Sequence, residues 1–172
     1  YHEIGMDHFA LTSDSLYKAA HNKTLHRNFM GYSASKTQLM IGLGVSSISD
    51  SWYSFAQNTK SLEDYYQLLE WNQLPLIKGH ILNDEDLIIR KHILNLTCTL
   101  ETSWNNEALY FEELPFVLLD LKEMERDQLL IIEENKIIIT EAGRPFVRNI
   151  CMAFDLHLKR KSPETNLFSM TV

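Results

Sequence analysis

The stretch LMIGLGVSSIS, residues 39–49, decides the expected fold. It is nearly all apolar, as in a strand that is buried on both faces. Such strands are typical of parallel sheets covered by helices, so the stretch predicts an α/β fold. The next residues, SWYSFAQN at 51–58, are expected to continue the strand in an extended conformation.

Helix signals lie on both sides of this strand. Ser13 precedes an expected short helix, and Ser61, with Asp64 three residues later, begins another that Pro75 ends. LPLIKGHIL at 74–82 is expected to be a short strand, and Asn83 is expected to cap a long amphipathic helix. Residues 1–80 are therefore predicted to form a first, α/β domain.

The second predicted domain, residues 81–172, has a different pattern. An apolar helical region around residues 109–121, interrupted by Pro115, precedes two apolar runs, 129–132 and 137–139, that are joined by EENK as in a β-hairpin. Thr140 is expected to cap a last helix with one apolar face, made of Val147, Ile150, Cys151, Phe154 and Leu158. Helix, helix, hairpin, helix is the order of a winged-helix-like module, and the tail 162–172 has no periodicity.

Composition limits the class of protein. The 172 residues are 45% hydrophobic and 23% charged, which is ordinary for a globular protein. The chain begins at Tyr1, so we expect a processed product or a piece of something longer. No apolar stretch approaches the roughly 20 residues of a membrane span, and no signal peptide is recognisable, so a cytoplasmic location is expected. The net charge of −7 disfavours a nucleic-acid binder.

Metal and nucleophile motifs are not recognisable. No metal-binding spacing links His8, His21 and His26 with Asp7, so no metal site is predicted from them. Cys98 and Cys151 stand alone within apolar patterns and are expected to be buried thiols. No serine lies in a GxSxG motif.

Several residues have two interpretations that the sequence leaves open. Gly42-Leu43-Gly44 relieves crowding in a sheet or lets a ligand approach the backbone. Arg27 binds a carboxylate or forms a surface ion pair. Asp7 and His8, as neighbours, point in opposite directions, so one faces a cavity while the other anchors the loop. Arg148 belongs to an anion site or to a solvated helix face.

Longer motifs resemble the oxygen-independent coproporphyrinogen III oxidases, radical S-adenosylmethionine enzymes of haem biosynthesis. YHEIGMDHFAL at 1–11 and LHRNFMGYSA at 25–34 carry the resemblance, together with LMIGLGVSSIS and TEAGRPFVRNICMAFDLHLKRK at 140–161. The likeness covers nearly the whole chain in unbroken order. It implies the carboxyl-terminal portion of such an enzyme: the end of an incomplete TIM-type barrel over residues 1–80, then a mainly helical, winged-helix-like domain over 81–172.

The resemblance also implies a reaction. Two propionates of coproporphyrinogen III are oxidatively decarboxylated to vinyl groups, which gives protoporphyrinogen IX. The family uses two molecules of S-adenosylmethionine and a four-iron four-sulfur cluster held by CxxxCxxC. That motif is absent here, so the chain alone is expected to be inactive, with the cluster ligands in a preceding part of the parent enzyme.

Site residues follow from the same resemblance. Phe29, Met30 and Ile48 are implied contacts of S-adenosylmethionine, although the family has glutamine where Met30 stands. Another departure is Lys78, where arginine is frequent. We further expect Asp7, His8, Arg27 and Arg148 to contact the substrate.

Two other functions are alternatives to this one. A haem chaperone of the same superfamily differs at the RNFMGY segment, where it has HN and an aromatic pair. A winged-helix regulator that binds nucleic acid is disfavoured, since residues 106–172 hold 8 Lys and Arg against 12 Asp and Glu. The parent enzyme is expected to be a monomer without nucleic-acid or membrane partners, and its electron donor is not identified.

Overall fold

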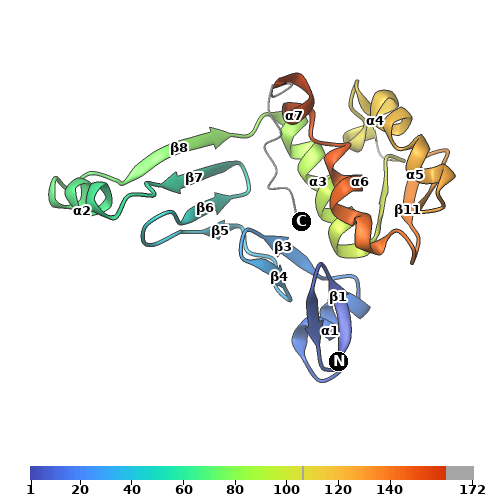
Figure 1. Cartoon of the computed structure of the whole chain (residues 1–172), viewed down its shortest axis with the longest axis horizontal. Coiled ribbons are helices and arrows are strands. Elements are labelled where there is room, and N and C mark those ends of the chain that lie inside the picture. The colour runs from blue at the N-terminus through green and yellow to red at the C-terminus, as the bar shows by residue number, and fades with distance from the viewer. Residues whose placement is uncertain (106, 162–172) are drawn as a thin grey trace, which may run out of the picture. The chain divides into compact units, whose positions relative to one another are not determined.

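A computed structural model describes residues 1–105 and 107–161 (Figure 1). The chain divides into two compact units, Tyr1–Arg90 and Lys91–Val172. The division falls inside helix α3 (Asp84–Thr99), whereas the sequence suggested a boundary between residues 80 and 81. The expectation for the tail 162–172 lies outside the described residues.

The first unit begins with two small antiparallel hairpins and a helix. Strands β1 (His2–Gly5) and β2 (His8–Ala10) form one hairpin, and β3 (His26–Asn28) and β4 (Gly31–Ser33) form the other. Helix α1 (Ser15–His21) lies between them in sequence, and its cap is Asp14, whose Oδ1 accepts from Leu16 N at 2.7 Å. The cap at Ser13 was therefore wrong by one residue, because Asp14 has the extended backbone of a cap and an oxygen in reach of the first turn.

A four-stranded sheet makes up the rest of this unit. Its order is β5 (Leu39–Met40), β6 (Ile48–Ser51), β7 (Ser54–Asn58) and β8 (Leu76–Ile81), with every pair antiparallel (Figure 1). The chain turns back between β6 and β7, so the expected extended continuation is in fact a hairpin. The expected parallel sheet is likewise wrong, since all strand pairs of the described residues are antiparallel.

The apolar stretch 39–49 is a loop flanked by two short strands and not one buried strand. Gly44 has a φ of +95°, and its carbonyl accepts from Asn58 Nδ2 at 2.8 Å and from Ser47 Oγ at 2.7 Å. Because side chains bind the loop carbonyls, the loop needs no neighbouring strand. Leu43 is 86% exposed, so the apolar pattern does not report burial here.

The helices around β8 begin as the sequence predicted. Helix α2 (Leu62–Glu70) has Ser61 as its cap, which accepts from Asp64 N at 3.2 Å, and it ends at Glu70, before Pro75. Helix α3 has a reciprocal cap: Asn83 Oδ1 accepts from Asp86 N at 2.8 Å, and Asp86 Oδ2 accepts from Asn83 N at 3.1 Å. The strand predicted at 74–82 is confirmed as β8.

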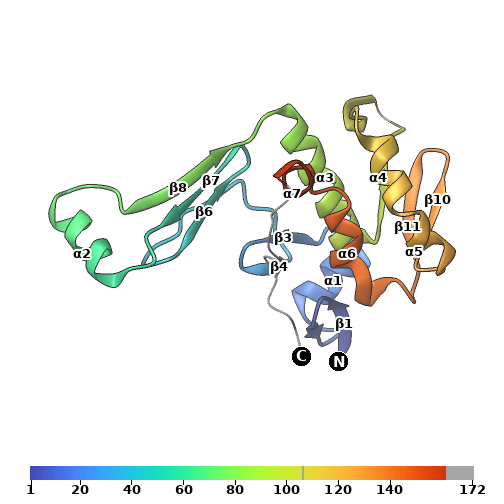
Figure 2. The same cartoon turned by 45° about the horizontal axis from the view of Figure 1, so that its top comes forward.

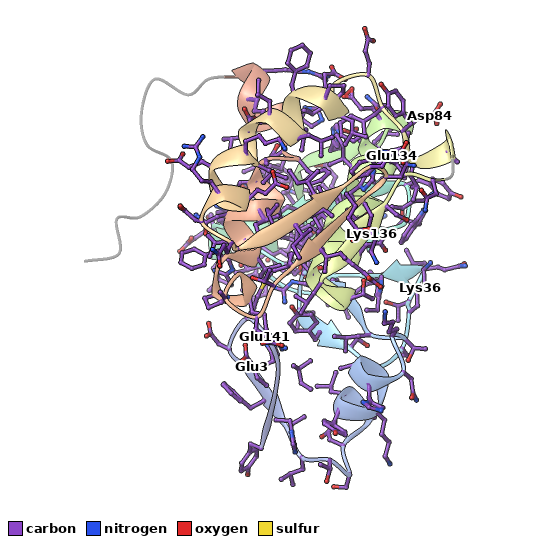
Figure 3. The ribbon with its side chains drawn as sticks, turned by 90° about the vertical axis from the view of Figure 1, so that its right-hand side faces the viewer. Glu3, Lys36, Asp84, Glu134, Lys136 and Glu141 are labelled. Carbon is purple, nitrogen blue, oxygen red and sulfur yellow. The ribbon has the colours of Figure 1, made fainter. Side chains whose placement is uncertain are left out.

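The second unit packs short helices around a three-stranded antiparallel sheet, ordered β10–β11–β9 (Figure 2). The predicted hairpin is confirmed as β10 and β11, and Figure 3 labels Lys136 on it. The apolar region around 109–121 is divided, since an α-helix begins only at Leu114, and Pro115 lies in the first turn of that helix, α4, where its missing N–H is harmless. The elements are β9 (Glu101–Ser103), η1 (Glu107–Leu109), α4 (Leu114–Asp120), α5 (Lys122–Arg126), β10 (Leu130–Glu133), β11 (Lys136–Ile139), η2 (Arg144–Phe146), α6 (Val147–Met152) and α7 (Leu156–Lys161).

The last predicted helix is broken into three pieces. Thr140 does not cap it: its Oγ1 accepts from Gly143 N at 3.1 Å and closes a turn before η2. The predicted apolar face is nonetheless buried, except for half-buried Leu158. Its buried members are Val147, Ile150, Cys151 and Phe154.

Buried polar groups in this unit are paired. His92 is fully buried, and its Nε2 donates to the Leu109 carbonyl at 2.8 Å, so its Nδ1 accepts from Thr102 Oγ1 at 2.8 Å. Cys151 is buried as predicted, Cys98 is half-buried, and no disulfide joins the two. Among the described residues, no helix is both long and apolar enough to cross a membrane.

Candidate functional site

A cavity of about 320 Å³ lies on the sheet of the first unit. The register brings the lining residues together, because the successive cross-strand pairs Phe55–His80, Ala56–Gly79 and Gln57–Lys78 all belong to the lining. The cavity is lined by Phe29, Ile48, Phe55, Ala56, Gln57, Lys78, Gly79 and His80. Space for a side chain at Gly79 is limited, since an added Cβ would lie 3.1 Å from the Phe55 carbonyl oxygen.

One wall of the cavity is apolar. Phe29, from the turn between β3 and β4, meets Phe55 of β7 edge to face, with ring centroids 5.0 Å apart and planes at 86°. Ile48 lies opposite Gln57 in the sheet and adds an aliphatic side chain. Phe29 remains 53% exposed, so this wall can accept the flat face of a ligand.

Arg90 supports this wall from α3. Its Nη2 donates to both carboxylate oxygens of Asp50, at 2.9 and 3.0 Å, and its Nη1 donates to the carbonyls of Ser51 and Trp52, each at 3.2 Å. The guanidinium also lies 4.7 Å from the Trp52 ring centroid and 4.9 Å from that of Phe55. We call this cluster the Arg90 clamp. It fixes the Phe55 ring, against which Phe29 packs.

The surroundings of the clamp disfavour a positive charge on His26. Burial lowers the pKa of His26, and the positive charges of Lys36 and Arg90 lower it further, against a smaller opposing effect of Asp50. Lys36 itself lies 4.4 Å above the Trp52 ring. His26 is therefore held in its neutral form by its burial and by these cations.

The other side of the cavity is polar. His80 donates from Nε2 to Asp86 Oδ2 at 2.9 Å, and Asp86 is buried within the α3 cap. The Gln57 amide donates to the Ser46 carbonyl at 3.1 Å. Lys78 lines the cavity between them on the exposed strand β8.

A second cluster joins the two hairpins of the first unit. A Cβ on Gly5 would meet the Tyr32 hydroxyl at 2.7 Å, and one on Gly31 would meet His8 Nε2 at 2.9 Å, so each glycine makes room for the aromatic ring of the other hairpin. Arg27 lies over the Tyr32 ring at 4.7 Å. Arg27 Nη1 is buried, and no hydrogen-bond partner for it is present among the described residues.

The structure brings together some of the predicted site residues. Phe29 and Ile48 line the same cavity, but Met30, which is 83% exposed, does not. Asp7 is exposed in the β1–β2 turn, while His8 Nδ1 donates to the Met6 carbonyl at 3.0 Å and so anchors that turn. Neither residue lines this cavity.

Other residues lie elsewhere or were missed. Arg148 is exposed on α6 of the second unit. The lining residues Phe55, Gln57, Lys78 and His80 were not predicted, because their convergence depends on the pairing of β7 with β8. One sequence signal for this cavity was present: in the strand β8, Gly79 lies between Lys78 and His80, whose side chains are on the same face of the sheet.

Similar proteins are found by sequence. No model of a known protein family matches the chain. The oxygen-independent coproporphyrinogen III oxidase of Escherichia coli is 38% identical over 94% of this chain and 36% of its own length. The enzyme of Pseudomonas aeruginosa is 37% identical over 92% of this chain and 35% of its own length. The enzyme of Thermostichus vulcanus is 36% identical over 96% of this chain and 53% of its own length. The chain thus spans about a third to a half of the length of these relatives.

A solved structure agrees with them. Coproporphyrinogen III oxidase from Escherichia coli, described as a radical SAM enzyme, has a TM-score of 0.81 and 36% identity over 90% of this chain and 37% of that one. The resemblance stated from the sequence is therefore confirmed over nearly the whole chain, and the mixed α/β architecture is similar to that of the matching part of this enzyme.

Proposed function

We propose that this chain, similar to coproporphyrinogen III oxidases over 94% of its length, is the carboxyl-terminal part of an oxygen-independent enzyme of that kind. The whole enzyme would oxidatively decarboxylate two propionates of coproporphyrinogen III to vinyl groups, giving protoporphyrinogen IX. It would act as a monomer in the cytoplasm, without nucleic-acid or membrane partners.

One observation of the structure carries the proposal. Phe29 and Ile48, 19 positions apart in the sequence, line one cavity, and both are implied contacts of S-adenosylmethionine. The apolar wall of Phe29 and Phe55 fits a flat ring of such a ligand. Met30 would contribute apolar contact from its exposed position, since its thioether cannot reproduce the two-way hydrogen bonding of the glutamine usual there.

The cofactors divide between this chain and the rest of the enzyme. When bound, S-adenosylmethionine and a four-iron four-sulfur cluster supply the radical that removes hydrogen from the substrate. The chain cannot hold such a cluster, because its two cysteines are fewer than the three thiolates of CxxxCxxC. Its own contribution is the wall that binds and orients a ligand, so the chain alone is expected to be inactive.

Arg27 is the residue proposed to bind a propionate of the substrate. A guanidinium binds a carboxylate through two parallel hydrogen bonds, and the buried Nη1 offers a donor for one of them. Stacking on Tyr32 holds the guanidinium, while His8 packs against Tyr32 at 5.2 Å and fixes the turn that carries Asp7. Arg148 is the proposed contact from the second unit.

The domain identities belong to the same proposal. Residues 1–80 would be the end of an incomplete TIM-type barrel. Residues 81–172 would be the winged-helix-like domain, a proposal supported by the order α4, α5, hairpin β10–β11 and α6.

The proposal is tested by the gene and by its complete product. The reading frame upstream of Tyr1 should encode CxxxCxxC, and the complete polypeptide, reconstituted anaerobically, should convert coproporphyrinogen III to protoporphyrinogen IX. The 172-residue chain alone should give no product. A complete reading frame without the three thiols, or a stable stoichiometric haem complex without turnover, would overturn the proposal.

Arg27 is tested separately in the complete enzyme. Arg27→Ala should raise the apparent KM for the substrate about tenfold or more, because a charge-assisted hydrogen-bonded pair is lost. Arg27→Lys should restore only part of the affinity, since an ammonium cannot bind a carboxylate in the same bidentate geometry. An unchanged KM for Arg27→Ala would remove this residue from the site.

A further inference from the structure

We infer that Lys78 binds a carboxylate of the ligand whose apolar part rests on Phe29, Ile48 and Phe55. The four residues line one cavity of the first unit. The sequence analysis noted Lys78 only as a departure from the arginine that is frequent in the family, so the inferred role comes from the cavity and not from the motif.

Charge balance around the cavity supports the inference. No carboxylate of the described residues forms an ion pair with Lys78, whereas Lys122 and Lys136 contact Glu125 and Glu101 at 2.7 and 2.8 Å. Asp86, the partner of the lining residue His80, is buried and contacts His80 Nε2 at 2.9 Å. Lys78 therefore presents a positive charge that the surrounding protein does not neutralise.

The neighbouring side chains are already committed to the scaffold. Gln57 lies directly opposite Lys78 in the sheet, and its Nε2 donates a hydrogen bond to the Ser46 carbonyl. Asp50 is neutralised by Arg90 within the clamp. A ligand that covers the apolar wall thus meets one available cation at its edge, which favours a ring-bearing anion.

Two ligands of the proposed function carry such a carboxylate, and the inference rests on that function for their identity. S-adenosylmethionine has the carboxylate of its amino-acid moiety, and coproporphyrinogen III has four propionates. The shared chemistry is a carboxylate at the end of an aliphatic chain, in a molecule that also carries a ring system. Because β8 is exposed, the interaction is partly screened, and its contribution to affinity should be small and sensitive to salt.

The test compares matched ligands on the complete polypeptide encoded by the gene. Binding of S-adenosylhomocysteine is compared with that of its decarboxylated analogue, and binding of coproporphyrin III with that of its tetramethyl ester. The variants are Lys78→Met, which removes the charge, and Lys78→Arg, which keeps it. Lys60→Met, on an exposed residue outside the cavity lining, is the control for charge alone.

We expect Lys78→Met to weaken binding of a carboxylate-bearing compound about threefold to fivefold at low salt, and to leave its carboxylate-free counterpart unchanged. Lys78→Arg and Lys60→Met should bind like the unaltered protein. A loss confined to S-adenosylhomocysteine assigns Lys78 to the cofactor, and one confined to coproporphyrin III assigns it to the substrate; either supports the inference.

Three results would overturn it. The first is equal binding of both carboxylate-bearing compounds by Lys78→Met and the unaltered protein. The second is an equal loss for the carboxylate-free compounds, which would indicate a merely structural role. Failure of the unaltered protein to bind either class of compound would overturn the proposed function itself, together with the inference.

Discussion

The two units of the chain are stabilised in different ways. The second unit has a dense apolar interior, with Leu96, Leu114, Val117, Ile137, Ile150 and Phe154 at or near zero exposure. In the first unit the buried apolar residues are few and partly small, namely Ile4, Ala10, Ala19, Leu25 and Ile89. Its sheet instead depends on strand pairing, loop hydrogen bonds from Asn58 and the Arg90 clamp.

This difference separates stability from ligand binding. The cavity lies in the unit with the smaller core, where apolar side chains such as Phe29 remain available to a ligand. The clamp binds β6 and the turn that joins it to β7, through Asp50, Ser51 and Trp52. The comparison predicts that apolar truncation affects the second unit most, and that loss of a single charged partner affects the first.

The largest expected effect is that of Phe154→Ala. Phe154 is fully buried against His92 and Phe111, with ring centroids 5.3 and 6.4 Å away, so truncation leaves a cavity and should cost about 3–5 kcal/mol. Amide hydrogen exchange should report this loss in β10 and β11. Phe116→Ala, on an exposed ring of α4, should change stability by less than about 0.5 kcal/mol. Equal effects of the two variants would contradict the packed interior.

Arg90→Met should act mainly on the first unit. It leaves Asp50 buried without its cation, which costs about 3–5 kcal/mol for a typical buried pair. Amides of β6 and β7 should exchange faster, while those of β10 and β11 should not. Adding Asp50→Asn should recover part of the loss, because a neutral amide is less costly to bury than a charge. Unchanged exchange in β6 and β7 would show that the clamp does not hold the sheet.

The next effect concerns pH and His92. Burial lowers the pKa of His92 below its ordinary value of 6.5, against a smaller raising effect of its bond to Leu109. As the pH falls below about 6.5, His92 binds a proton in the unfolded chain but not in the folded unit, so the free energy of unfolding decreases. Below the lowered pKa of the folded state, the decrease due to His92 ends.

His92→Leu isolates this contribution. It should cost about 1–3 kcal/mol at neutral pH, because Thr102 and the Leu109 carbonyl lose their partner. It should also flatten the pH dependence of unfolding below pH 6.5, measured by urea denaturation. His26 is present in both proteins, so its own titration cancels in the comparison. An identical pH dependence would exclude His92 as the titrating group.

The smallest expected effect is that of Ser61→Ala, at about 1 kcal/mol. The cap of α2 is lost, and because no residue of that helix is buried, the change should remain local. Faster amide exchange in α2 alone would agree with this. Ser61→Asp is the matched control and should keep the cap. Destabilisation of the second unit by Ser61→Ala would contradict the separation of the two units.

Local signals in the sequence located several elements well. Ser61 and Asn83 begin the predicted helices, and EENK joins the predicted hairpin strands. The prediction of a buried strand from the apolar stretch 39–49 was wrong, because apolar content reports burial only where a partner surface exists. Hydrogen bonds from Asn58 stabilise this stretch as a loop. For the candidate site, Phe29 and Ile48 followed from motifs, but Phe55, Lys78 and His80 did not.

The sequence by itself determined where helices and the hairpin begin, because caps and turns depend on residues within a few positions of one another. Its motifs also determined the similarity to coproporphyrinogen III oxidases. Only the tertiary structure decided that the sheet is antiparallel, that Arg90 binds Asp50 and that Lys78 lies beside Phe29 in one cavity. The last two bring together residues that are 40 or more positions apart, and strand register and packing do so without leaving a local pattern.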